Sequence, residues 1–355
     1  MSPSPDTSQD PDSELDASAA GRPSAAGKPA WWLRALSRLP FGALYALTGA
    51  IMWVLRHVFQ FRVAVARENL SRCFPERSAA QIEELLGQYY RQLSQVAAEF
   101  IKTADLSADQ LRSHLTLHNV DRIDAETRAG RSVLLLGAHQ CNWEWTLQVT
   151  VLFMGVQIEA GYKPLHSPYF DRELRTMRCQ YGGHLISAKR LLREVLRRRG
   201  QLHGVAMHAD QMPASSGRRQ WLSFLGRDTA FYPGPGEIAR MTGYAAFFVP
   251  MRRVWRGYYE LDCIPICAAG ERMDPQVFTA RYAGMVEQMI RENPADWTWI
   301  HKRWKFARPP DAPGEAQGEA QGDTKRRTGR SPRMANPPAE GCDRTALCPV
   351  CPISP

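Results

Sequence analysis

The sequence lacks the features of several protein classes. It has neither the serial long apolar segments of a polytopic membrane protein, nor the glycine period of collagen, nor the low hydrophobicity of a wholly disordered chain. No G-x-S-x-G motif is present, which disfavours a serine hydrolase, and no solenoid-type repeat occurs. The 355 residues are 44% hydrophobic and 23% charged, which is the composition of a globular protein.

No secretory leader is expected either, because the first apolar stretch begins only near residue 39. A secreted domain held together by disulfides is therefore not expected, although the chain has eight cysteines. Three of them, Cys342, Cys348 and Cys351, have a spacing that suggests zinc, but no fourth ligand lies nearby. No metal site is predicted, and the core cysteines are expected to be small buried hydrophobic residues.

Both ends of the chain differ from its middle. Residues 1–30 and 307–355 are rich in small and polar residues, so each is predicted to be a disordered tail. The first tail carries a net charge of −3 and the second a net charge of +1. Since the whole chain carries +9, residues 31–306 carry a net charge of +11. A basic middle of this kind indicates an anionic partner.

Residues 39–55 form an uncharged segment of 17 positions, flanked by arginines on both sides. A membrane-spanning helix needs about 20 apolar residues, so this segment fits a helix that dips into a bilayer or lies along it. Trp31, Trp32 and Trp53 are available as interfacial anchors. The alternative is an ordinary buried core helix. Residues 31–62 are therefore predicted to be a membrane-associated region that precedes the main domain, residues 63–306.

The main domain alternates between strand and helix patterns. Strands are predicted at 132–138, 156–162, 204–210, 245–251 and 258–264, and helices at 79–103, 169–180, 188–199 and 275–292. This alternation predicts an α/β fold with a mixed central sheet flanked by helices, in addition to the N-terminal membrane-associated helix.

The segment Gly137–Glu144 follows the strongest strand and carries the best candidates for catalysis. Loops at the carboxyl ends of strands are where α/β sheets bind ligands. His139 can act as a general base, and Glu144 can orient it if His139 lies in the strand-to-helix turn and Glu144 in the first helical turn. Cys141 is a weak nucleophile candidate, so a base without a protein nucleophile favours direct transfer to a substrate hydroxyl.

Two other patterns are weaker. Residues 234–239 read G-x-G-x-x-A, like a dinucleotide-binding loop, but no clear strand precedes them and a proline separates the glycines. His203, His208 and Asp210 could form a metal cluster, but no further carboxylate is close, which favours a structural role or a substrate contact.

Several motifs in order resemble one family. They are Arg67-Glu68-Asn69-Leu70 with Cys73-Phe74-Pro75, Gly137-Ala138-His139 with Asn142-Trp143-Glu144, Tyr162-Lys163-Pro164, Ser167-Pro168-Tyr169 with Arg178 and Gly182-Gly183, Asp210-Gln211, Phe224-Leu225-Gly226, and Asn293-Pro294 with the run from Trp297 to Lys305. Together they resemble the lauroyl/myristoyl acyltransferases of lipid A biosynthesis, within the lysophospholipid acyltransferase superfamily. The segment from His139 to Glu144 matches the H-x4-D/E box of that family.

The resemblance implies a glycerolipid acyltransferase-like fold and transfer of a fatty acyl chain from acyl carrier protein, or acyl-CoA as donor, to a hydroxyl of a lipid A precursor. It places the enzyme at the cytoplasmic face of a bacterial inner membrane. His139 would take the hydroxyl proton while Glu144 holds its tautomer, and Arg178 or a backbone N–H would stabilise the oxyanion. Asp210 would shape the site. No cofactor is implied.

The sequence departs from the family pattern in two places. Gln140-Cys141 replaces the usual Phe-Gly, and Lys163 stands where arginine is common. Tyr162 and Lys163 are predicted to bind substrate, but lysine lacks the bidentate fork of arginine, so the acceptor could be another lysolipid, aminolipid or glycolipid. A different alternative is a nucleic-acid-binding protein that uses the Trp/Lys/Arg run at 297–305; nucleic acid is not the predicted partner.

Overall fold

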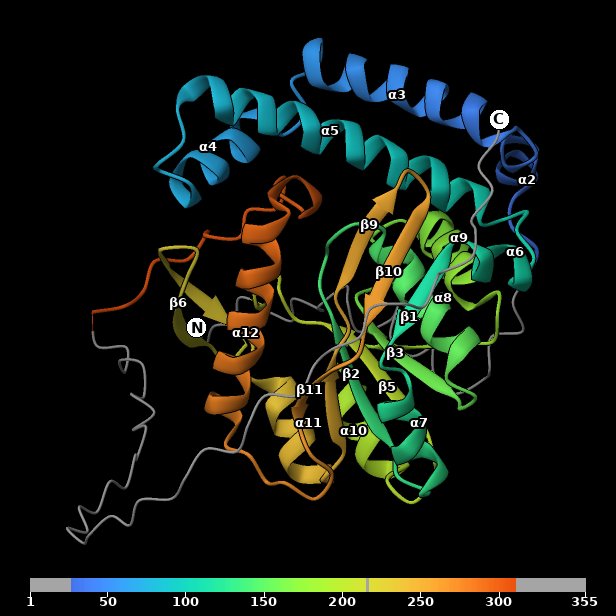
Figure 1. Ribbon diagram of the computed structural model, residues 1–355, viewed down its shortest axis with the longest axis vertical. Coiled ribbons are helices and arrows are strands. Elements are labelled where there is room, and N and C mark those ends of the chain that lie inside the picture. Colours follow the sequence, from blue (N-terminus) through green and yellow to red (C-terminus); the bar gives the residue numbers. More distant parts are fainter. Residues whose placement is uncertain (1–26, 215–216, 311–355) are drawn as a thin grey trace, which may run out of the picture. The chain divides into compact units, whose positions relative to one another are not determined.

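The computed structural model describes residues 27–214 and 217–310 (Figure 1). The two predicted disordered tails lie almost entirely outside the described residues, as do Cys342, Cys348 and Cys351 of the zinc pattern. The five cysteines within the described residues are all buried and free, as expected for small core residues.

A six-stranded mixed sheet forms the centre of the domain, which confirms the predicted α/β class. Its strand order is β11 (Ile264–Cys267), β8 (Ala245–Phe248), β2 (Val133–Gly137), β5 (Gly204–His208), β3 (Ile158–Tyr162) and β4 (His184–Ser187). The strands from β8 to β4 are parallel, and β11 is an antiparallel edge. All five residues of β2 are buried, which explains its continuous apolar sequence.

Helices cover both faces of this sheet (Figure 1). Alternate side chains of β2 enter two different hydrophobic clusters, Leu134 and Leu136 in one and Val133 and Leu135 in the other. The helices of the main domain are α4 (Val63–Cys73), α5 (Ala79–Lys102), α6 (Ala108–Ser113), α7 (Asp121–Arg128), α8 (Trp143–Phe153), α9 (Pro168–Cys179), α10 (Leu191–Arg197), α11 (Gly234–Thr242) and α12 (Pro275–Glu292).

Two smaller sheets complete the domain. One has the order β1 (Leu115–His118), β10 (Tyr258–Asp262) and β9 (Met251–Trp255), and the other pairs β6 (Gln220–Phe224) with β7 (Arg227–Phe231). The predicted single strands at 245–251 and 258–264 are wrong in extent, because each spans parts of two strands. Pro250 lies at the first break, where it has no N–H with which to continue a ladder.

The predicted apolar segment at 39–55 is helical. Helix α2 (Trp31–Ser37) and helix α3 (Phe41–His57) follow one another with a bend of 115°. No single helix among the described residues is long and apolar enough to cross a membrane, although this bent pair passes that test together. Leu44 and Thr48 are buried on the side of α3 that packs against α5, so this helix is only partly a core helix.

The basic and aromatic run at 297–305 belongs largely to the core. Trp297, Trp299 and Arg303 are each no more than 2% exposed. Arg303 donates from Nη1 to the carbonyl of Ala230, at 2.7 Å. Because these rings are packed inside the protein, they are not available to stack on nucleic-acid bases, which removes the observation that supported nucleic-acid binding.

Candidate active site

His139 and Asp210 meet at the carboxyl edge of the central sheet. Strands β2 and β5 are parallel neighbours, and their last residues, Gly137 and His208, are register partners. His139 stands two residues after the first strand and Asp210 two residues after the second. Because both residues lie two positions beyond paired strand ends, their side chains come together, although 71 positions separate them in the sequence.

Asp210 binds His139 at two points. Its Oδ1 accepts a hydrogen bond from His139 Nδ1 at 2.7 Å, and its Oδ2 accepts one from the His139 backbone N–H at 2.9 Å. Because an ionised carboxylate only accepts, Nδ1 carries the proton and Nε2 keeps its lone pair. The Asp210 side chain is fully buried, whereas the His139 side chain is 22% exposed. The imidazole is therefore fixed on one side and accessible on the other.

The electrostatics of the site keep Asp210 charged and His208 neutral. Burial alone would raise the pKa of Asp210, but the charge and hydrogen bonds of His139 hold it well below its ordinary value. Burial, with the charge of His139, lowers the pKa of His208 to about 3. The two imidazole rings lie edge to face with centroids 4.9 Å apart. Because His208 is neutral, Asp210 is the charged group that pairs with His139.

The C-terminal segment holds the turn that carries His139. Thr298 donates from its backbone N–H and from its hydroxyl to the carbonyl of His139, at 3.1 and 2.8 Å. Trp297 donates from Nε1 to Asp210 Oδ2 at 2.9 Å. Gln140 also forms an isolated antiparallel bridge with Trp297. His139 and Asp210 are therefore both tied to the end of the domain, a relationship that no local pattern had indicated.

Glu144 does not orient His139, which corrects the expectation drawn from their spacing. It lies in the first turn of α8, as expected, but its oxygens accept two hydrogen bonds from Arg178 of α9, at 2.7 and 2.8 Å, and one from Trp143 Nε1 at 3.0 Å. Burial opposes ionisation of Glu144, but the charge of Arg178 and, more weakly, that of His139 lower its pKa. Glu144 is thus the ionised partner of Arg178.

Arg178 was expected to stabilise an oxyanion directly. Its Nε and Nη2 atoms are both used by Glu144, and Nη1 has no hydrogen-bond partner among the described residues. The Arg178 side chain is 22% exposed. The bidentate pair fixes the plane of the guanidinium and directs its remaining amino group away from the carboxylate.

Tyr162 and Lys163 lie at the end of β3, which neighbours β5, and so at the same edge of the sheet as His139 and Asp210. Tyr162 is buried, and its ring lies 5.8 Å from the Arg175 guanidinium. Lys163 is exposed. Within the described ranges, no hydrogen bond, ion pair or ring contact joins either residue to His139, Glu144, Arg178 or Asp210, so their predicted contact with substrate stays a prediction.

The weaker sequence patterns have structural explanations. The Cys141 thiol is buried and donates to the Met251 carbonyl, and burial raises its pKa, so it is not an activated nucleophile. His203 directly precedes β5, whereas His208 ends this strand and Asp210 lies two residues beyond it, so the three do not cluster. Gly236 is the second glycine of the G-x-G-x-x-A pattern. It lies inside α11, where an added Cβ would meet the backbone of Pro275 at 2.8 Å. Close helix packing therefore accounts for its lack of a side chain.

Sequence reasoning missed the role of Asp210 and the contacts of Trp297, Thr298 and Tyr282. The Tyr282 hydroxyl donates to the Gly137 carbonyl at 2.7 Å and accepts from the Ala209 backbone N–H at 3.2 Å. It thereby joins the ends of the two strands that position His139 and Asp210. A signal for the pair was present, because His139 directly follows the strand predicted at 132–138 and Asp210 ends the strand predicted at 204–210, but strand order was not known.

The chain is similar to known proteins over most of its length. A profile of the bacterial lipid A biosynthesis acyltransferases matches residues 29–306. The lipid A biosynthesis lauroyltransferase of Escherichia coli K12 is 25% identical over 293 residues, which cover 79% of this chain and 90% of that protein.

Two further E. coli K12 relatives are a palmitoleoyltransferase and a myristoyltransferase of lipid A biosynthesis. They are 23% identical over 269 residues and 22% identical over 249 residues. The matches cover 76% and 68% of this chain, and 87% and 74% of the relatives. Because the profile spans the whole described domain, site included, the chain belongs to the bacterial lipid A biosynthesis acyltransferase family.

Proposed function

We propose that this acyltransferase moves a fatty acyl chain of the lauroyl or myristoyl type from acyl carrier protein to a hydroxyl of a lipid A precursor, in lipopolysaccharide biosynthesis. The observation that carries the proposal is the His139–Asp210 pair, in which a buried carboxylate binds Nδ1–H and leaves Nε2 free to accept a proton. A positioned base of this kind suits attack by a substrate hydroxyl.

His139 acts first as a base and then as an acid. Nε2 removes the proton of the acceptor hydroxyl as its oxygen attacks the thioester carbonyl, which forms the new carbon–oxygen bond. The tetrahedral intermediate then collapses, the carbon–sulfur bond breaks, and His139 returns the proton to the departing thiolate. Asp210 stabilises the imidazolium between these steps through its bond to Nδ1.

Arg178 stabilises the oxyanion of the intermediate with its Nη1 amino group, and Glu144 holds the guanidinium in place for this. Glu144 thus keeps a role at the site, although through Arg178 rather than through His139. Tyr162 and Lys163, at the same edge of the sheet, bind the phosphorylated glycolipid acceptor, and the net charge of +11 on residues 31–306 suits both this acceptor and an acidic carrier protein.

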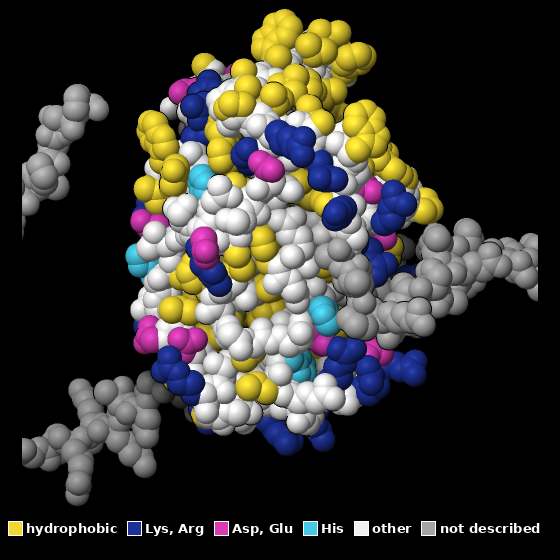
Figure 2. All heavy atoms as spheres, turned by 90° about the vertical axis from the view of Figure 1, so that its right-hand side faces the viewer, with side chains coloured by type: hydrophobic (Ala, Val, Ile, Leu, Met, Phe, Trp, Pro, Cys, Tyr) yellow, Lys and Arg dark blue, Asp and Glu magenta, His cyan; other side chains and the backbone are white. Residues whose placement is uncertain are grey.

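The outer face of α3 lies in the membrane interface, on the cytoplasmic side of the inner membrane. Its exposed apolar residues include Ile51 and Trp53, which are 50% and 59% exposed, and Val58, directly after the helix, is 63% exposed. Figure 2 shows hydrophobic side chains gathered at the top of the molecule, where α3 lies in Figure 1. Because the opposite face of α3 packs against α5, the helix lies along the bilayer rather than through it.

The test is acyl transfer by the purified protein in lipid vesicles. Lauroyl-, myristoyl- and palmitoleoyl-carrier protein are each offered with a tetra- or penta-acylated lipid A precursor, and products are identified by mass spectrometry. Transfer to the precursor, abolished by His139→Ala, supports the proposal. Transfer only to a lysophospholipid or an aminolipid would instead establish the alternative acceptor that Lys163 leaves open.

A further inference from the structure

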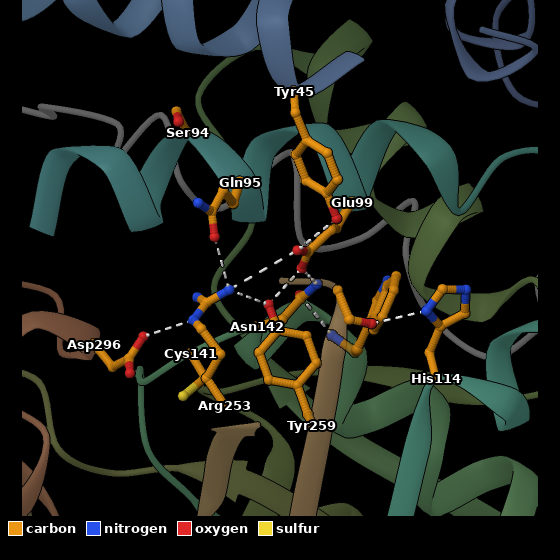
Figure 3. Close-up of polar contacts among 12 residues, drawn as sticks. Tyr45, Ser94, Gln95, Glu99, His114, Cys141, Asn142, Arg253, Tyr259 and Asp296 are labelled. Carbon is orange, nitrogen blue, oxygen red and sulfur yellow. Dashed lines mark hydrogen bonds and ion pairs between the residues drawn. The ribbon is translucent and has the colours of Figure 1, made fainter. Parts of the chain in front are cut away.

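Glu99 is a buried carboxylate outside the site described above. It lies near the end of α5 and is 0% exposed. Its Oε1 accepts from the Tyr45 hydroxyl at 3.1 Å, and its Oε2 accepts from Asn142 Nδ2 at 2.8 Å and from the Tyr259 hydroxyl at 2.5 Å (Figure 3). Since every partner donates, the geometry is that of an ionised carboxylate.

Arg253 provides the positive charge of this cluster. Its Nη1 lies 3.9 Å from Glu99 Oε1 and donates to the Tyr259 hydroxyl at 2.8 Å, and its Nε donates to Asp296 Oδ1 at 3.1 Å. The Arg253 side chain is 12% exposed. Burial keeps the pKa of Glu99 above its ordinary value, although the Arg253 charge and the three hydrogen bonds act in the opposite direction.

The cluster contacts the turn that carries His139 at two successive residues. Asn142 donates to Glu99, and its Oδ1 also accepts from the Trp145 N–H as the N-cap of α8. Cys141 donates its backbone N–H to the carbonyl of Asp296, at 2.9 Å. Cys141 has φ of +50°, in the left-handed region that is strained for a residue with a side chain. Surrounding contacts must hold the backbone there.

We propose that Glu99 is a positioning residue for acyl transfer: its carboxylate fixes Asn142, and with Arg253 and Asp296 it maintains the strained turn that directs His139 at the substrate. The expected effect on the transfer rate rests on the proposed function. The expected support of the turn by Glu99 does not depend on that function. An apolar side chain of similar size would fill the same space without the desolvation cost of a buried charge, so stability alone does not explain an acid here.

The test compares Glu99→Gln and Glu99→Leu with a matched control. Glu159 is also a buried acid, 1% exposed and paired with Arg198, but it lies in the first half of β3 and its partner belongs to the end of α10. Glu159→Gln therefore removes a buried charge without touching the turn. Transfer kinetics, thermal midpoints and hydrogen exchange of the amides of residues 139–145 are measured for each full-length variant.

We expect Glu99→Gln to lower kcat by up to about 10²-fold with KM little changed, since small misplacement of a catalytic group has effects of this size. Amide exchange should accelerate at 139–145 and stay slow in β2. Glu159→Gln should alter the thermal midpoint but neither kcat nor exchange at the turn. If Glu99→Leu does not fold, Glu99→Gln still decides the question.

The positioning role is overturned if Glu99→Gln leaves both kcat and exchange at 139–145 unchanged, or if exchange accelerates equally throughout the domain. Failure of the proposed function is distinguishable, because the unaltered protein would then transfer no acyl chain to the lipid A precursor. The exchange measurement would still report whether Glu99 holds the turn.

Discussion

Gly137 leaves the space that the imidazole of His208 occupies. A Cβ at residue 137 would lie 2.5 Å from His208 Nε2, and these two residues are register partners at the ends of β2 and β5. A larger residue at this point would displace the His208 imidazole, which packs edge to face against the ring of His139.

Gly137→Ala is therefore expected to reduce kcat strongly and to destabilise the fold by about 1–3 kcal/mol, the usual cost of overpacking. Transfer kinetics and urea unfolding measure the two effects. Gly49→Ala is the matched control, since a Cβ there would meet nothing within 4 Å. Equal effects of the two substitutions would contradict the explanation given for Gly137.

His139→Ala and Asp210→Asn should each lower kcat by about 10²–10⁴-fold while the protein stays folded. In Asp210→Asn, an amide nitrogen in place of Oδ2 would face two donors, the His139 backbone N–H and Trp297 Nε1. We therefore expect the nitrogen in place of Oδ1, where it donates to Nδ1 and moves the imidazole proton to Nε2, the atom that must accept the substrate proton. Steady-state transfer with circular dichroism checks this. Near-normal turnover of His139→Ala would refute the mechanism.

Glu144 and Arg178 should behave as one unit. If Glu144 acts only by holding the guanidinium, Glu144→Ala and Arg178→Ala should each lower kcat by about 10²–10³-fold, which is the effect of losing an oxyanion donor. The double variant should then have a kcat little lower than that of either single variant. A double-mutant cycle on kcat measures this coupling. Multiplicative effects would show that Glu144 acts independently, for example on His139.

The pKa of His208 predicts how stability depends on pH. It is about 3 in the folded protein and about 6.5 in an unfolded chain. Between these values the unfolded state binds more protons, so the free energy of unfolding should rise with pH and level off above about 6.5. Urea unfolding from pH 4 to 8 tests this. His208→Gln should flatten the dependence, and exposed His57→Gln should not.

The outer face of α3, together with its C-cap residue Val58, should determine vesicle binding. Ile51→Asn and Val58→Asn each remove an exposed aliphatic side chain, whose burial contributes about 1.5–3 kcal/mol, so each should weaken binding to anionic vesicles by roughly tenfold or more. Val277→Asn, at a 46% exposed position of α12, is the control. Unchanged sedimentation of both α3 variants with vesicles would show that another surface binds the membrane.

The sequence predicted elements well where local signals were strong. Helix α12 has the predicted bounds, because Asp274 caps its first turn and Asn293-Pro294 ends it. The strand at 132–138 was identified because a buried parallel strand is apolar on both faces. His139 was placed correctly in the turn after it.

The partners of His139 were not predictable in the same way. Glu144 is near in sequence, but the ion pair with Arg178 depends on the packing of α8 against α9. Asp210 is distant, and its position follows from the pairing of β2 with β5. Strand order is set by the whole fold, so local periodicity cannot reveal which strand ends become neighbours.

The contacts between Thr298 and His139, which are 159 positions apart, have a consequence for how the protein is made. A ribosome releases the N-terminal part of a chain first, and loop closure over such a distance is slow compared with local helix formation. A nascent chain that ends before Trp297 has both His139 and Asp210 but lacks the donors of Trp297 and Thr298 that bind them. We therefore expect the site to be complete only after residues 297 and 298 have left the ribosome.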